Sequence, residues 1–130
     1  MQFSLFRVSL LLIVFGIILG AMGAHSLEEK LTADQLDSFK TGVSYQLYNG
    51  LGLLIITHMM SRFRKQAFRI GSNLILAGTL LFSISIYLLA AGGLEDSVKA
   101  ILGPITPIGG SIMIIGWFVL AFGLQRKEHS

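Results

Sequence analysis

Four long stretches of the chain are apolar and contain no Asp, Glu, Lys or Arg. They cover residues 8–27, 41–61, 70–94 and 100–125. Each is close to the roughly 20 residues with which a helix crosses the hydrocarbon core of a bilayer. A segment in lipid must satisfy its backbone hydrogen bonds internally, which helices do and open strands do not. The pattern therefore predicts an all-α integral membrane four-helix bundle. Residues 1–130 form one domain, with spans at about 6–25, 42–60, 70–91 and 106–125.

The connection between the first two spans carries two patterns typical of helix starts. Ser26 is followed by Glu29, and Thr32 is followed by Gln35, which is the spacing of a capping box. The residues after Thr32 carry an apolar stripe at helical intervals: Leu36, Phe39 and Val43. We therefore expect two short helical pieces, the second of which is a short interfacial helix between the first two spans.

Small residues recur at packing intervals in the first and last spans. The two sets are Gly16, Gly20 and Ala24, and Gly109, Gly116 and Gly123. Such faces let another helix approach closely.

Residues 1–27 also fit a signal peptide with a cleavage site at 21–23. The packing spacing favours a first helix that is retained. Thr106 followed by Pro107 predicts that the fourth helix begins there.

The distribution of Lys and Arg predicts the orientation. Seven of these residues lie at the two termini and in the turn at 62–69, whereas three lie in the other two connections. The positive-inside rule then places both termini of a multi-pass plasma-membrane protein in the cytoplasm. Four cations of the turn are expected to contact anionic lipid headgroups: Arg62, Arg64, Lys65 and Arg69.

Composition removes several classes of function. Only 13% of the residues are charged, about half the usual share for a soluble domain. The absence of cysteine excludes disulfides, thiolate metal sites and dithiol redox chemistry. The basic residues border membrane spans, so we expect no nucleic-acid partner. No cofactor and no metal site is predicted, because His25 has only Glu28 and Glu29 as local ligands.

One group of polar residues is a candidate site. His25 ends the first span, and Tyr45, Gln46 and Asn49 begin the second, so antiparallel helices would bring all four to one level. The cluster is either a hydrogen-bonded clamp between the first two helices or a site for a lipid headgroup, a quinone-like ligand or a metal. The hydroxyls of the third span are expected to bond to their own backbone: Thr79, Ser83 and Ser85.

Two motifs carry a family resemblance. Residues 20–25 read GAMGAH, and residues 41–51 read TGVSYQLYNGL. They resemble the GA-x-GAH and TG-x-x-YQ-x-Y-H-A-L motifs of the small four-helix membrane proteins called domain of unknown function 423, or transmembrane protein 256-like. Asn49 and Gly50 depart from that pattern, where many members are expected to have His and Ala. The resemblance implies four spans and a retained first helix, and it supplies no activity, substrate or cofactor.

Three classes of function remain open. The first is a structural or accessory subunit that acts through helix contacts, as a homo-oligomer or in a larger membrane complex. The second is a small oligomeric transporter or channel, although no carboxylate lies inside the four uncharged stretches. A protein that binds lipid or quinone through the polar cluster is a further alternative. An enzyme is the weakest hypothesis, because no nucleophile, base or metal is identified.

Overall fold

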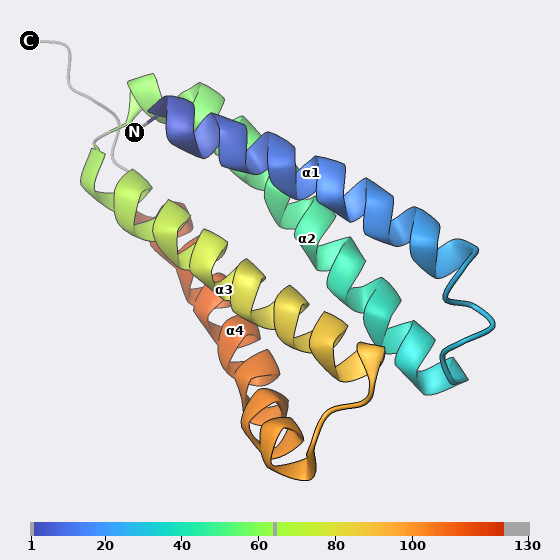
Figure 1. Cartoon of the computed structure of the whole chain (residues 1–130). Helices are drawn as coiled ribbons and strands as arrows, with labels where there is room; N and C mark the ends of the chain where they lie inside the picture. Colours follow the sequence, from blue (N-terminus) through green and yellow to red (C-terminus); the bar gives the residue numbers. More distant parts are fainter. Residues whose placement is uncertain (1, 64, 124–130) are drawn as a thin grey trace, which may run out of the picture.

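The computed structural model describes residues 2–63 and 65–123, and these form four α helices. The helices are α1 (Gln2–Ala24), α2 (Ala33–Met59), α3 (Lys65–Ala91) and α4 (Asp96–Gly123), with a one-turn 3-10 helix η1 (Met60–Arg62) between α2 and α3. Successive helices run in opposite directions, as Figure 1 shows. We call the end with the start of α1, η1 and the end of α4 the basic end. The other end, with connections 25–32 and 92–95, is the loop end. The all-α membrane fold is confirmed.

Three of these helices are long and apolar enough to cross a membrane. The matching segments of the described chain are Ser4–Ala24, Gln66–Ala91 and Asp96–Gly123. The remaining helix, α2, is 27 residues long and is therefore long enough, but it is not among these three. It is less apolar because its first turns carry Asp34, Asp37 and Lys40.

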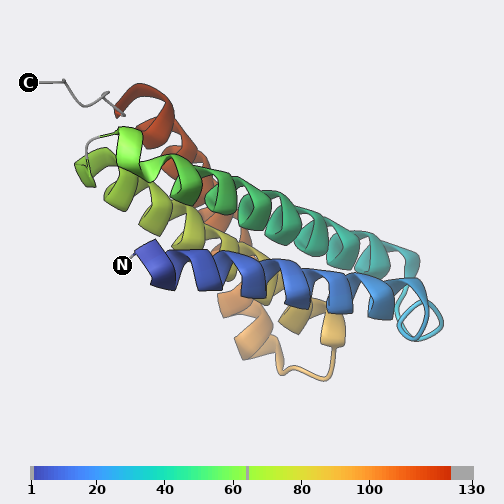
Figure 2. The same cartoon turned by 90° about the horizontal axis from the view of Figure 1, so that it is seen from above.

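The centre of the bundle is α2, which packs against α1 on one side and α3 on the other, while α4 packs against α3. Figure 2 shows α1 and α2 lying side by side along their length. A core near the basic end contains Leu5, Leu12, Leu53, Phe68, Ile75 and Leu120. A smaller core near the loop end contains Phe39, Val43 and Ala90. The polar side chains described below lie between these two cores.

Glycines bring the backbones of α3 and α4 into contact. A Cβ atom at Gly78 would lie 2.7 Å from the carbonyl oxygen of Gly109, and one at Gly116 would lie 2.8 Å from the backbone nitrogen of Ile75. Such distances are too short for any side chain. Gly123, at the end of the same series, is exposed, and its nearest neighbour is the side chain of Ala67. The close contact is therefore tightest in the middle of α4.

The interface of α1 with α2 also uses small residues, but with a different third member. Gly16 and Gly20 face Leu47 and Val43 of α2, whereas Ala24 is exposed. Gly23 takes the expected place of Ala24, since a Cβ there would lie 3.1 Å from the ring of Phe39. A helix has 3.6 residues per turn, so a face that contains residues 16 and 20 returns at residue 23.

The expected separate interfacial helix is wrong in its boundary, because its residues are the first turns of α2. Thr32 caps α2 with both bonds of a capping box: Gln35 N donates to Thr32 Oγ1 at 3.2 Å, and Thr32 N donates to Gln35 Oε1 at 3.0 Å. No feature interrupts the helix between this cap and the apolar part. Ser26 caps no helix, since its hydroxyl donates to the carbonyl of Met22 instead.

The predicted start of the fourth helix at Thr106 is also wrong. α4 begins at Asp96, three turns earlier, and contains Pro104 and Pro107 in its interior. An acidic residue in the first turn is favourable at the positive end of a helix dipole, which supports the earlier start. The hydroxyl of Thr106 does not cap a helix and instead lies 2.6 Å from the hydroxyl of Ser85 on α3.

Candidate functional site

Two amide side chains on α2 are buried in the middle of the bundle. Gln46 and Asn49 lie three residues apart and therefore share a helix face. Their exposed fractions are 6% and 4%. Side chains buried to this extent are shielded from water, so each amide needs partners within the protein.

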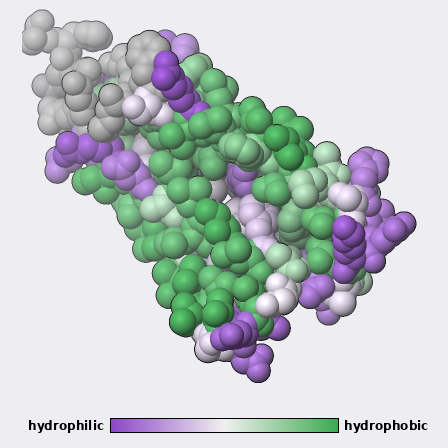
Figure 3. All heavy atoms as spheres, in the orientation of Figure 1, coloured by the Kyte–Doolittle hydropathy of each residue, from purple (hydrophilic) through white to green (hydrophobic). Residues whose placement is uncertain are grey.

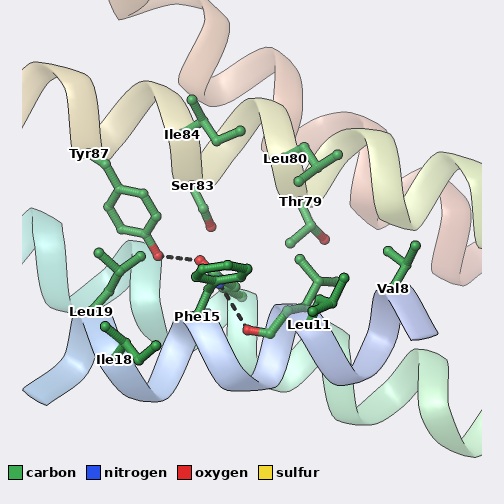
Figure 4. A pocket seen from close by; sticks show the side chains of 12 residues that line it. Val8, Leu11, Phe15, Ile18, Leu19, Thr79, Leu80, Ser83, Ile84 and Tyr87 are labelled. Atoms are coloured by element: carbon green, nitrogen blue, oxygen red, sulfur yellow. Dashed lines mark hydrogen bonds between the residues drawn. The ribbon is translucent and has the colours of Figure 1, made fainter. Parts of the chain in front are cut away.

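Gln46 joins α1 to α3 through its two amide atoms. Its Nε2 donates to the backbone carbonyl oxygen of Leu12 at 2.9 Å. The phenol of Tyr87 donates to its Oε1 at 2.6 Å. Both bonds are drawn in Figure 4. α1 comes this close because Gly16 has no side chain, and a Cβ atom there would lie 2.6 Å from Cδ2 of Leu47.

Asn49 joins α2 to α3 and α4. Its Nδ2 donates to Thr79 Oγ1 at 2.8 Å and to the sulfur of Met113 at 3.1 Å. Trp117 Nε1 donates to its Oδ1 at 3.0 Å. Thr79 gives its own hydroxyl hydrogen to the carbonyl of Ile75 at 2.6 Å, so its oxygen is left to accept. Between them, the two amides connect α2 to all three other helices.

The hydroxyls of α3 divide between local and interhelical bonds. Thr79 bonds to its own helix, as expected, but it also accepts from α2. The expectation of local bonding is wrong for Ser83, whose hydroxyl donates at 2.8 Å to the carbonyl of Gly42 on α2. Gly42 allows this approach, since a Cβ there would lie 3.0 Å from the ring of Tyr87. Ser85 donates within α3 to Phe82 and also meets Thr106.

A cleft of about 380 Å³ lies between α1 and α3, with α2 behind it. We call it the α1–α3 cleft. Its walls are mainly aliphatic, with Leu11 and Phe15 from α1 and Leu80 and Ile84 from α3 (Figure 4). Its polar lining consists of Gln46, Thr79, Ser83 and Tyr87. On this face of the molecule, Figure 3 shows purple and pale atoms between two green ridges. The polar groups are already paired, so the free surface of the cleft is suited to hydrocarbon.

The structure separates the four residues of the predicted polar cluster. His25 is exposed at the loop end, and its side chain makes no hydrogen bond within the described residues. Gln46 instead reaches Leu12, which is 13 residues before His25 and thus roughly 20 Å along the helix. Tyr45 is exposed, and its ring packs edge-on against Phe82. The prediction that these four residues lie at one level assumed that α2 begins near Thr41, whereas α2 begins two turns earlier.

Two of the four residues predicted to contact lipid headgroups are described in full, and both lie at the basic end. Arg62 and Arg69 are exposed there. Arg64 lies outside the described residues, and so does the side chain of Lys65. Within the described parts of the chain, no three His, Cys, Asp or Glu side chains form a group that could hold a metal ion.

Sequence reasoning missed the partners of the two amides, above all Tyr87 and Trp117. Both residues carry one polar atom on a large apolar ring and lie inside long apolar stretches. A buried Tyr or Trp usually has a hydrogen-bond partner, which was the available signal. The sequence could not indicate which amide each would meet, because that depends on the rotation of α3 and α4 about their axes.

Comparison with known proteins agrees with this membrane architecture. A family model described as Protein of unknown function (DUF423) matches residues 19–110. The UPF0382 membrane protein SSP2132 of Staphylococcus saprophyticus is 40% identical, over 80% of this chain and 82% of the relative. The UPF0382 membrane protein YwdK of Bacillus subtilis is 38% identical, over 78% and 80%.

The UPF0382 inner membrane protein YgdD of Escherichia coli is 32% identical, over 87% of this chain and 82% of its own. No solved structure matches the chain. The matched segment 19–110 contains Gln46, Asn49 and Tyr87, and therefore most of the buried polar network. By the extent of the family match and the identity of these relatives, the chain belongs to the DUF423 family of membrane proteins of unknown function.

Proposed function

We propose that this protein is a structural or accessory membrane subunit that acts through contacts of its helices with other membrane proteins. The observation that supports this role is the network of hydrogen bonds that Gln46 and Asn49 of α2 make to the other helices. Every amide hydrogen-bonding atom of Gln46 and Asn49 has a partner on another helix. A network of this kind holds a rigid bundle together and leaves its outer surfaces for binding.

The outer faces of α1 and α4 are the surfaces available to a partner. Ile17 on α1 is 60% exposed, and Phe122 on α4 is 82% exposed. Phe118 and Phe122 stack with ring centroids 5.9 Å apart. Between membrane helices, association depends on close van der Waals packing, and rigid aromatic side chains offer large contact areas.

The proposal includes an orientation with α2 as a fourth span and the basic end in the cytoplasm. The uncharged part of α2, residues 41–59, has nearly the length of a span. Arg7, Arg62 and Arg69 are exposed. Each cation near an anionic leaflet contributes about 1 kcal/mol of attraction. Anionic lipid is therefore the expected neighbour of this end.

Photo-crosslinking from the two outer helices tests the subunit role. A benzoylphenylalanine is placed at Ile17 or at Phe118, and the irradiated membranes are analysed by mass spectrometry. An accessory subunit should give one protein adduct of fixed mass from one of the two positions. Mild-detergent purification should yield the same complex without irradiation. Adducts of lipid mass alone at both positions, together with a purified monomer, would contradict the proposal.

A second candidate function is the binding of a lipidic chain in the α1–α3 cleft, which that cleft's volume and aliphatic walls favour. Leu80→Trp would fill the cleft, whereas Leu81→Trp, with the same 40% exposure, lies outside its lining. If the cleft holds a chain, only Leu80→Trp should remove the lipid that co-purifies in native mass spectrometry. Equal lipid retention by the two variants would exclude this function.

A further inference from the structure

A second cleft opens at the loop end, on the other side of the bundle from α1. It lies between the first turns of α2 and of α4, with the last turns of α3 behind it, and its volume is about 520 Å³. Figure 1 shows α4 diverging from α2 towards this end. We call it the α2–α4 cleft. It shares no lining residue with the α1–α3 cleft, so it is an independent cavity.

One wall of the α2–α4 cleft is polar. Asp34, Ser38 and Thr41 follow each other at intervals of four and three residues, so they form a stripe on one face of α2. The hydroxyl of Ser38 has no hydrogen-bond partner among the described residues. Thr41 gives its hydroxyl hydrogen to the carbonyl of Asp37 at 3.0 Å, so its oxygen can still accept a bond.

The opposite wall is apolar, and the polarity of the cleft changes with depth. Phe82, Ile86 and Leu89 line it from α3, and Pro107 lines it from α4. Asp34 lies in the first turn of α2, whereas Thr41 is seven residues further on, about 10 Å deeper. A charged mouth thus leads to an apolar interior, which is the polarity profile of a membrane lipid from headgroup to chain.

The charge of the mouth is negative. Among the described lining residues Asp34 is the single ionisable group, and it makes no ion pair within the described chain. The adjacent amide and hydroxyls of Gln35 and Ser38 are neutral. A carboxylate in this position is complementary to a positively charged donor and repels an anionic headgroup.

We propose that the α2–α4 cleft binds a membrane lipid whose headgroup carries a primary ammonium. The ammonium donates to the carboxylate of Asp34, the polar linkage of the lipid meets Ser38 and Thr41, and one chain lies along Phe82 and Pro107. This proposal does not depend on the subunit role above. It assigns a ligand class to a site at the level where lipid headgroups are found.

Competitive lipid binding tests the proposal. The purified protein in detergent is given equal amounts of phosphatidylethanolamine and phosphatidylglycerol with identical chains, and native mass spectrometry counts the bound lipids. The wild type should retain more phosphatidylethanolamine. Asp34→Asn should lower that retention by about fivefold, the upper value for an exposed ion pair, and should not lower the retention of phosphatidylglycerol, since the repulsion of its anionic headgroup is removed. Asp37→Asn is the matched control, since Asp37 is exposed on the same helix and outside the lining.

A second variant tests the chain-binding part. Gly103 lines the cleft, and a Cβ atom there would meet nothing within 4 Å, so Gly103→Leu should fill the cleft without a clash. It should reduce the binding of both lipids, while the melting temperature without added lipid stays that of the wild type. Equal retention of the two lipids by the wild type would overturn the proposal. So would an effect of Asp37→Asn as large as that of Asp34→Asn.

Discussion

At the scale of single residues, the arrangement depends on two amides whose partners come from different helices. Asn49 is the more demanding of the two, because its two donors and its acceptor are used by Thr79, Met113 and Trp117. Interhelical hydrogen bonds in membranes contribute about 0.6 kcal/mol each on average, with a maximum near 1.7. Their sum is modest, but the cost of leaving one partner unpaired in lipid is larger than the gain from one bond.

Asn49→Ala should therefore lower the free energy of unfolding by about 1–3 kcal/mol, because it leaves the indole N–H of Trp117 without its acceptor. Thermal melting in a defined detergent measures this loss. Tyr48→Phe is the matched control, since Tyr48 is the adjacent residue, is 64% exposed, and has no hydrogen-bonded hydroxyl among the described residues. If both variants melt at the same temperature as the wild type, the network does not stabilise the bundle.

Gln46 and Tyr87 form a pair that can be tested by a double-mutant cycle. Gln46→Ala removes two bonds, and Tyr87→Phe removes one of these same bonds. The combined loss of stability should thus be smaller than the sum of the two single losses by about 0.6 kcal/mol, the usual value of one such bond. Strictly additive losses would show that the bond between Tyr87 and Gln46 makes no contribution.

At the scale of elements, glycine spacing governs how α3 and α4 meet. The close positions Gly109 and Gly116 on α4 are seven residues apart, and so are Gly71 and Gly78 on α3. Each lies where the two backbones are nearest, and the matched spacing keeps the pair in register over two turns. This hairpin is the most closely packed part of the described chain, and its rigidity supports the polar partners Thr79 and Trp117.

A single methyl group at this contact should be destabilising. Gly116→Ala would place a Cβ atom 2.9 Å from the carbonyl oxygen of Gly71, so α3 and α4 must separate, at a cost of about 1–3 kcal/mol. Gly110→Ala is the control, because its Cβ would lie at an ordinary 3.6 Å from the ring of Phe82. Thermal melting compares the two variants. A larger drop in melting temperature for Gly110→Ala than for Gly116→Ala would contradict the close contact.

The elements also show what the sequence could and could not predict. The existence of four helices followed from uncharged stretches of span length, and a helix start after Thr32 followed from its capping box, although that helix was expected to be a separate short one. The candidate site did not follow, because helix length decides which residues share a level. Charged turns of α2 continue its helix beyond the apolar part, and this extension moves Gln46 away from His25. Two prolines similarly lie inside α4 where a helix start was expected.

At the scale of the whole molecule, charge and topology agree in dividing the bundle into two ends. The basic end contains η1 and the exposed cations Arg62 and Arg69. Acidic residues gather at the loop end, in connection 25–32 and in the first turns of α2 and α4. An even number of antiparallel helices brings the start of α1 and the end of α4 to the same end (Figure 1). Cations retained on the cytoplasmic side would then fix the whole bundle in one direction.

The absence of native cysteine allows this orientation to be tested with single introduced thiols. Ser38→Cys and Ser97→Cys lie at the loop end, where both side chains are exposed, and Ser61→Cys lies within η1 at the basic end. With the basic end in the cytoplasm, an impermeant maleimide added to intact cells should label the first two and spare the third. Permeabilised cells should label Ser61→Cys as well, which controls for its reactivity. The reverse labelling pattern would show that the protein has the opposite orientation in the membrane. In that orientation the α2–α4 cleft and Asp34 would lie in the cytoplasmic leaflet. The same three variants therefore determine which leaflet supplies the proposed ammonium lipid.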